Sequence, residues 1–202
     1  MRLKIGVLPA PIDFQAGGIL GLSMLDPVAN LINIGTGGIP GIGIHHVAIV
    51  SRHAGTTLVY ESTTAERLPC HYTGKITPGV SAHSLAEWIS WFKGRKTKIW
   101  YYGLRAPLYT DEEMRLDAWL YNQIGRPYDM AGASRAGGWI TNALFALMHG
   151  EDLSSLFCSE LCAAGLIHTG RLLTNDASRW SPNKLCRFGV RRGLLNSPVR
   201  VL

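Results

Sequence analysis

Two β-rich runs separated by a short turn constrain the fold of this 202-residue chain more than any other feature. The runs cover residues 44–50 (IHHVAIV) and 57–62 (TLVYES), and the segment between them contains Gly55. Runs rich in β-branched residues and bounded by a short glycine-containing turn predict a β-hairpin. We therefore expect an antiparallel sheet at the centre of the fold.

The register of this hairpin decides whether a histidine meets a carboxylate. If the turn is centred between His53 and Ala54, His46 lies directly opposite Glu61. If the centre is one residue later, between Ala54 and Gly55, the two residues become diagonal neighbours on the same face. A turn with an odd number of residues would place them on opposite faces.

The remaining pattern predicts helices and strands in mixed order, so the expected fold class is α+β. Apolar spacing predicts a helix over 20–32, and residues 84–92 are expected to form a short amphipathic helix ended by Gly94. Thr110 and Glu113 form a predicted capping box for a helix that ends at Gly125. Its inward residues are expected to be Met114, Ala118, Leu120, Tyr121 and Ile124. Strands are expected over 68–72, 97–104 and 188–190, and helices over 139–148 and around Cys158.

The composition favours a single domain spanning residues 1–202. The chain is 47% hydrophobic and 17% charged, which is typical of a globular protein rather than a disordered one. Residues 1–43 are rich in glycine and proline, residues 191–202 form a basic tail, and no linker or repeat divides the chain.

The formal net charge of +6 raises the question of an anionic partner, such as nucleic acid, a lipid surface or a cell-wall polymer. Much of the charge lies near the C-terminus and in a cluster over residues 93–98. A basic tail and a solvated loop explain both without a partner. No nucleic-acid reader motif is recognisable, so we expect no specific nucleic-acid partner.

The chain has no evident leader or membrane span. The N-terminal apolar run is cut by Pro9 and Asp13, and the apolar stretches 17–50 and 137–148 are interrupted or too short. We expect no signal peptide and no transmembrane segment, and therefore a cytoplasmic or virion-associated protein. The four cysteines are irregularly spaced, which argues against a disulfide framework.

Cys158 is the candidate nucleophile. The sequence predicts that it lies at or beside the first turn of a buried helix, where unpaired N–H groups and the helix dipole favour a thiolate. A cysteine nucleophile needs a base and a group that orients the base. The hairpin offers His46 as the base and Glu61 as its orienting partner. The competing interpretation is that Cys158 is a small buried apolar residue, as free cysteines often are.

Five short motifs in one order resemble the circularly permuted NlpC-type papain-like cysteine hydrolases, and the YiiX-like branch in particular. They are HVAIV at 46–50, VYE at 59–61, GRPYD at 125–129, FCSEL at 157–161 and SPNKL at 181–185. In that family, as here, the histidine strand precedes the cysteine helix. The resemblance covers roughly residues 15 to 190 by motif order.

The resemblance implies a papain-like α+β domain with a small antiparallel sheet or barrel packed against helices. Cys158 would attack an amide, ester or thioester carbonyl, with His46 as general acid and base and Glu61 as the orienting residue. Tyr128 would line the substrate pocket, and the Cys158 N–H, at a helix start, would donate to the oxyanion. The implied activity is that of a cysteine peptidase or amidase without a cofactor or metal. The implied substrates are peptides, amides or lipid esters, cell-wall peptides above all, and the partners include components of a virion or injection device.

Two alternatives remain open at this point. One is a metal site built from Cys70, His71, Cys158, Cys162 and Cys186, although only Cys158 and Cys162 have a suitable spacing. The other is a catalytically silent module that binds a glycan or a partner through its aromatic residues. These are Trp88, Trp91, Trp100, Tyr101 and Tyr102. Such a module could be a structural component of a phage particle.

Overall fold

The computed structural model describes residues 11–24, 39, 43–63, 68–127 and 154–202. Its strands are β1 (Ile19–Met24), β2 (His46–His53), β3 (Thr56–Thr63), β4 (Gly79–Ser84), β5 (Thr97–Tyr102) and β6 (Val199–Arg200). Its α-helices are α2 (Leu85–Phe92), α3 (Thr110–Tyr121), α5 (Ser154–His168) and α6 (Pro182–Arg191). A short 3₁₀ helix, η1 (Ala177–Arg179), precedes α6.

The strands form one sheet in the order β4-β3-β2-β1-β5-β6, and every neighbouring pair is antiparallel. The α+β class and the antiparallel sheet are therefore confirmed, and the sheet is open rather than closed into a barrel. Among the described residues, every helix is too short or too polar to span a membrane.

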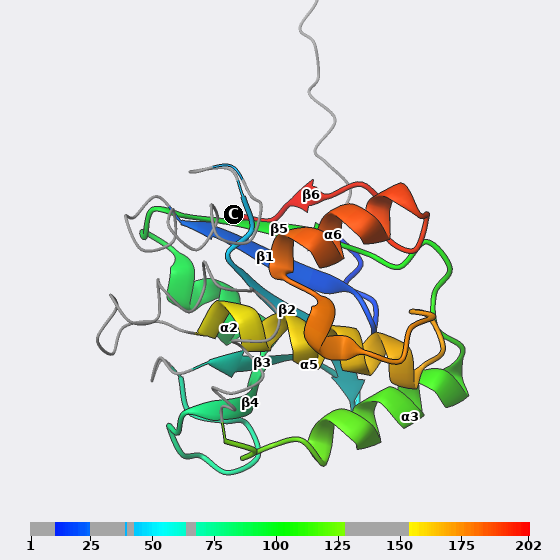
Figure 1. The fold of residues 1–202 in the computed structure, drawn as a ribbon. Coiled ribbons are helices and arrows are strands. Elements are labelled where there is room, and N and C mark those ends of the chain that lie inside the picture. Colours follow the sequence, from blue (N-terminus) through cyan, green and yellow to red (C-terminus); the bar gives the residue numbers. More distant parts are fainter. Residues whose placement is uncertain (1–10, 25–38, 40–42, 64–67, 128–153) are drawn as a thin grey trace, which may run out of the picture.

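Two hydrophobic cores lie on opposite faces of the sheet. One joins Ile49 and Tyr60 of the hairpin to Leu116 of α3 and Leu166 of α5. The other joins the hairpin's Val50 and Val59 to α2, through Trp88 and Phe92. Figure 1 shows α5, in yellow, crossing the sheet between α6 and α3. Because residues alternate between faces along a strand, one hairpin supplies both cores.

The hairpin adopts the later of the two predicted registers. His53 pairs with Thr56, so the turn is centred between Ala54 and Gly55. Both turn residues have positive φ, 46° for Ala54 and 80° for Gly55. This is the pattern of a type I′ turn, whose twist matches that of the flanking strands.

The expected helix over 20–32 is wrong where the structure describes it. Ile19–Met24 is a strand, β1, held between β2 and β5. Leu20 and Leu22 face one core while Ile19 faces the other. A short run buried on both faces is apolar throughout and cannot be distinguished from a helix by periodicity. Residues 25–32 lie outside the described chain, as do residues 139–148.

The expected strand over 188–190 is also wrong, because these residues belong to α6. The Ser181 side chain caps this helix by accepting the Lys184 N–H at 3.3 Å, and Pro182 occupies its first turn. A serine cap followed by proline is a helix start signal. The basic tail that follows is partly ordered by the sheet, since β6 pairs with β5.

Smaller corrections concern α3 and the segment before β4. Glu112 rather than Glu113 reaches back, accepting the Tyr109 N–H at 2.8 Å. Leu120 is buried as expected, but Met114 and Tyr121 are 63% and 52% exposed. Residues 68–72 form a bend and turn rather than a strand.

Candidate functional site

The site is built where β2 and β3 separate and α5 approaches them. The β2–β3 register runs from the turn to the pair Ile49–Tyr60. Beyond that pair, the Val47 N–H donates to the Cys158 sulfur at 3.4 Å. Helix α5 therefore places its sulfur against the backbone of the strand that carries His46.

His46 and Glu61 form a buried pair. The register makes them diagonal neighbours on one face of the hairpin, and His46 Nε2 lies 2.7 Å from Glu61 Oε2. Each side chain is 1% exposed. An ionised carboxylate only accepts hydrogen bonds, so Nε2 of His46 carries a hydrogen and donates it to Glu61. The other ring nitrogen, Nδ1, then faces away from Glu61.

The charge state of His46 follows from its neighbours. Burial alone would lower its pKa, but Cys158 and then Glu61 outweigh burial and raise the pKa to about 10. The Nδ1 atom makes no hydrogen bond with any described residue. Cys158 acts on the ring first through its charge and then through its side-chain contact with the imidazole. Contacts of this type are often long before a substrate binds.

Other thiols near Cys158 are held in the protonated form. Burial, followed by the charge of Cys158, raises the pKa of Cys162 well above its usual value. Burial and Cys158 likewise raise the pKa of Cys186 to about 12, and Tyr102 opposes this shift. All four cysteines are free thiols.

Glu61 has a second histidine beside it that the sequence did not indicate. His83 Nε2 lies 3.6 Å from Glu61 Oε1 and 2.8 Å from Ser81 Oγ. His83 Nδ1 lies 3.1 Å from the Pro69 carbonyl oxygen, which can only accept, so Nδ1 carries the hydrogen. The β3–β4 register places Ser81 opposite Glu61. A long connection before β4 hides this register from sequence patterns.

Two details differ from the sequence expectation, and both concern the chemistry of Cys158. The residue itself lies where expected, beside the first turn, as the fifth residue of α5. Only the first four N–H groups of a helix lack a partner inside it, so the Cys158 N–H is no free oxyanion donor. The second difference is access, because the Cys158 side chain is 0% exposed. Tyr128, the expected pocket residue, lies outside the described residues.

The residues of the alternative metal site do not assemble into a set of metal ligands. Among the described residues, no group of three or more histidines, cysteines or acidic residues is arranged to hold a metal ion. Cys70 interacts with the backbone of Ala82 in β4, and it is not part of the hydrophobic core that contains the other three thiols. Of the aromatic residues, Trp88, Tyr101 and Tyr102 belong to the cores.

Comparisons with known proteins find a similarity in structure but none in sequence. No protein-family model matches the sequence, and no curated protein is significantly similar to it. A solved structure described as the metalloprotein YiiX from Escherichia coli O157:H7 aligns over 93% of this chain and 96% of its own. The TM-score is 0.49 and the sequence identity is 15%. The word metalloprotein in that description applies to that structure alone.

Proposed function

We propose that this protein is a cysteine hydrolase, an amidase or peptidase that uses Cys158, His46 and Glu61. The observation that carries the proposal is the buried convergence of these three side chains from α5, β2 and β3. Burying a carboxylate and an imidazole costs desolvation free energy, which an apolar pair at the same positions would avoid. Such costly groups cluster at functional sites.

The geometry supports a covalent mechanism. The Cys158 thiolate attacks the substrate carbonyl carbon, and the carbonyl electrons move to oxygen. The C–N bond then breaks as His46 gives its proton to the departing amine. Water next attacks the thioester while His46 removes its proton, which releases the acid and restores Cys158. Glu61 accepts the Nε2 hydrogen throughout, so Nδ1 stays directed toward the sulfur.

The proposed substrates are amides of the cell-wall peptide type, with esters as a chemical variant. Cys158 is 0% exposed in this structure. Turnover therefore requires an opening movement that admits a carbonyl to the sulfur. The same burial favours a second candidate function, that of a catalytically silent component that retains the papain-like arrangement.

Site-resolved labelling separates these two functions. Iodoacetamide is added at pH 7, and the modification rate of each cysteine is followed by mass spectrometry. Cys70 and Cys186 are each 3% exposed, slightly more than Cys158. If exposure alone governs the rate, they react before Cys158. The hydrolase proposal expects the reverse order, because the thiolate is the reactive form.

Variants test the role of the base. His46→Ala should slow Cys158 labelling by at least about tenfold, since general-base assistance typically contributes a factor of ~10²–10⁴. His71→Ala is the matched control, because this histidine is exposed and is not one of the proposed site residues. Equal, slow labelling of all four cysteines in the wild type would instead establish the silent component. Hydrolysis of a cell-wall stem peptide that is lost in Cys158→Ala would complete the assignment.

A further inference from the structure

The Glu61 carboxylate lies between two histidines that belong to the strands on either side of β3. From β2, His46 Nε2 contacts Glu61 Oε2 at 2.7 Å. From β4, His83 Nε2 lies 3.6 Å from Glu61 Oε1. All three side chains are 3% exposed or less. The proposed mechanism uses the contact with His46 and leaves the role of His83 open.

The ring of His83 is held in one orientation by a partner at each nitrogen. Nδ1 donates to the Pro69 carbonyl oxygen at 3.1 Å, and Nε2 lies 2.8 Å from Ser81 Oγ. Ser81 is the residue of β4 that stands opposite Glu61. Side chains that are fixed by packing and by hydrogen bonds can hold a neighbouring functional group in place. The Nε2 edge of His83 therefore presents a fixed surface to Glu61.

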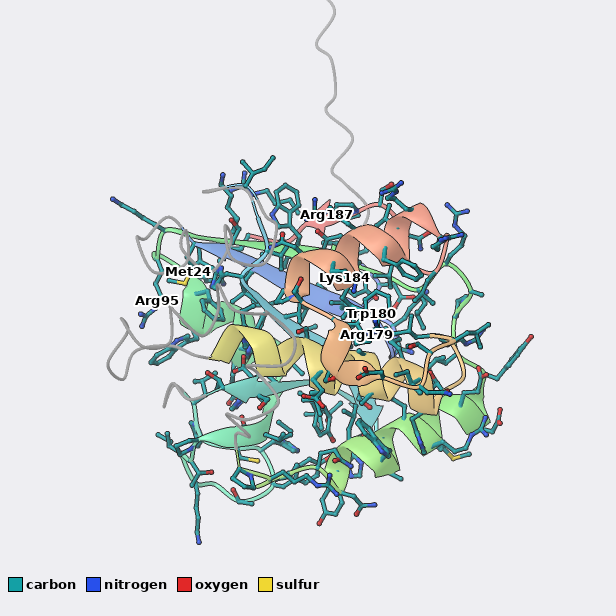
Figure 2. The ribbon with its side chains drawn as sticks, viewed as in Figure 1. Met24, Arg95, Arg179, Trp180, Lys184 and Arg187 are labelled. Carbon is teal, nitrogen blue, oxygen red and sulfur yellow. The ribbon has the colours of Figure 1, made fainter. Side chains whose placement is uncertain are left out.

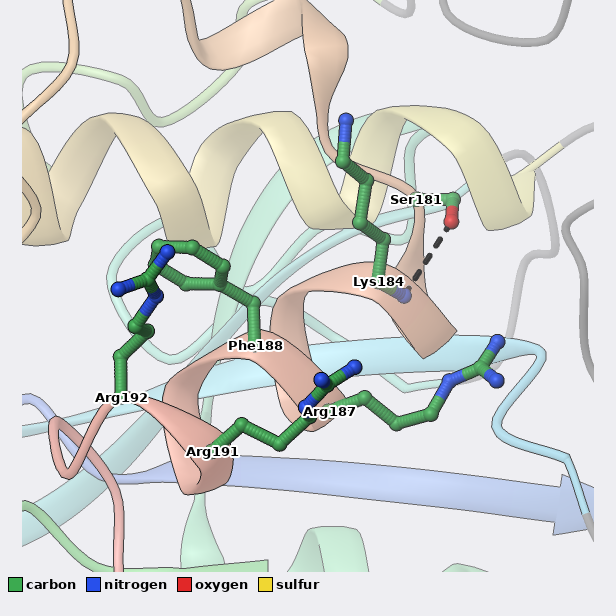
Figure 3. Close-up of a pocket in the computed structure, with 6 residues that line it drawn as sticks. All are labelled: Ser181, Lys184, Arg187, Phe188, Arg191 and Arg192. Carbon is green, nitrogen blue, oxygen red and sulfur yellow. Dashed lines mark hydrogen bonds between the residues drawn. The ribbon is translucent and has the colours of Figure 1, made fainter.

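Many basic side chains lie on a different part of the molecule. Figure 2 shows Lys184 and Arg187 on α6, and Figure 3 shows Arg187 and Arg191 extending along the same side of that helix. These side chains are exposed, and α6 packs near β1, which β2 and β3 separate from β4 in the sheet. Water and salt screen exposed charges, whereas a buried charge depends on neighbours that are also buried. His83 is such a neighbour of Glu61.

We propose that His83 is a positioning residue for Glu61, an inference that rests on the proposed hydrolase function. When the ring is neutral, Nε2 accepts the hydrogen of the Ser81 hydroxyl. When the ring is protonated, Nε2 donates toward Glu61 Oε1. In both states the ring fills the space beside Oε1, so the carboxylate stays directed at His46. The imidazole of His46 then keeps Nδ1 toward Cys158.

Two substitutions of His83 separate its two contacts. The amide of His83→Gln reaches about as far as Nε2, so it keeps a polar group beside Ser81 and Glu61. The shorter amide of His83→Asn reaches only the position of Nδ1 and keeps the contact with Pro69. We expect His83→Asn to slow iodoacetamide labelling of Cys158 at pH 7 by about threefold or more, because residues in one hydrogen-bonded network are energetically coupled. His83→Gln should label faster than His83→Asn. Equal rates in the two variants, or the reverse order, would overturn the inference.

A double-mutant cycle shows whether His83 acts through Glu61. His83→Asn should slow Cys158 labelling in the wild type and have no further effect in Glu61→Gln, because the carboxylate to be positioned is then absent. An equal slowing in both backgrounds would overturn the inference. The matched control is His71→Asn, at an exposed position, which should change neither rate. If His83→Asn does not fold, Ser81→Ala replaces it in the cycle, with the same expectation.

The titration of His46 tests the positioning of Glu61 without any substrate. Burial lowers the pKa of His46, while Cys158 and then Glu61 raise it. A carboxylate that has turned away from the ring therefore leaves a lower pKa, and NMR titration should show this in His83→Asn but not in His71→Asn. An unchanged pKa in His83→Asn would overturn the inference. If the wild type hydrolyses no amide but the pKa still falls in His83→Asn, the hydrolase function fails and the positioning of Glu61 stands.

Discussion

Protonated His46 carries a positive charge into the protein interior, and Glu61 and Cys158 compensate that charge. Although burial lowers its pKa, these two partners raise it from 6.5 to about 10. Below about pH 6.5 the ring is protonated in the folded and unfolded states, so the full stabilisation is present. As the pH rises toward 10, only the folded state keeps the proton, and the stabilisation is progressively lost.

The resulting prediction concerns unfolding by urea between pH 6 and pH 10. The difference in unfolding free energy between the wild type and His46→Gln should be largest at pH 6 and shrink as the pH rises. Its change should be on the order of a few kcal/mol, since each pKa unit corresponds to ~1.4 kcal/mol. A difference that stays constant over this range would show that His46 is not held protonated by its partners.

The His46–Glu61 pair of the candidate site could be predicted at the residue scale because it needs only one local register. His46 and Glu61 are joined by a short turn, and two of the three possible registers bring them together. That Cys158 approaches this pair from a helix distant in sequence was predicted only from the order of the motifs. The position of His83 beside Glu61 could not be predicted, because the register of β4 depends on a long connection.

At the level of single elements, the hairpin turn contains a residue in an unfavourable backbone conformation, and a substitution there can stabilise the protein. Ala54 has a φ of 46°, a left-handed conformation that is unfavourable for a residue with a Cβ. Asparagine tolerates this conformation, and Asn-Gly is the preferred type I′ pair. Ala54→Asn should therefore stabilise the protein by roughly 0.5 kcal/mol. The measurement is the urea midpoint, with Ala54→Val as the paired variant expected to lower it. A lower midpoint for Ala54→Asn would contradict the turn assignment.

The two elements that sequence patterns failed to predict have different physical causes. The strand β1 is decided by tertiary contacts that local periodicity does not register, whereas α6 is specified by a local start signal that its apolar residues obscure. Ile19 and Leu20 are apolar on both faces because β1 lies in the middle of the sheet. In α6, Phe188 and Val190 look like strand residues, yet the Ser181 cap and Pro182 specify a helix.

Across the whole molecule, α6 is tied to the strand that carries the candidate base. Asn183 Oδ1 accepts the Ile44 N–H at 2.9 Å, which joins residues 139 positions apart in the sequence. Ile44 lies two residues before His46, and both are buried. This hydrogen bond therefore holds the backbone just before β2 begins, and the position of the His46 imidazole depends on that backbone.

Asn183→Leu leaves the buried Ile44 N–H without its acceptor, which typically costs ~1–3 kcal/mol. Asn183→Asp keeps an acceptor oxygen in the same place and should recover most of that stability. The labelling rate of Cys158 should follow the same order, with a slower reaction in Asn183→Leu than in Asn183→Asp under conditions where both are folded. Circular dichroism establishes folding before each rate is measured. If the leucine variant loses stability but labels at the wild-type rate, α6 supports the fold without positioning His46, and the base is held by the hairpin and Glu61 alone.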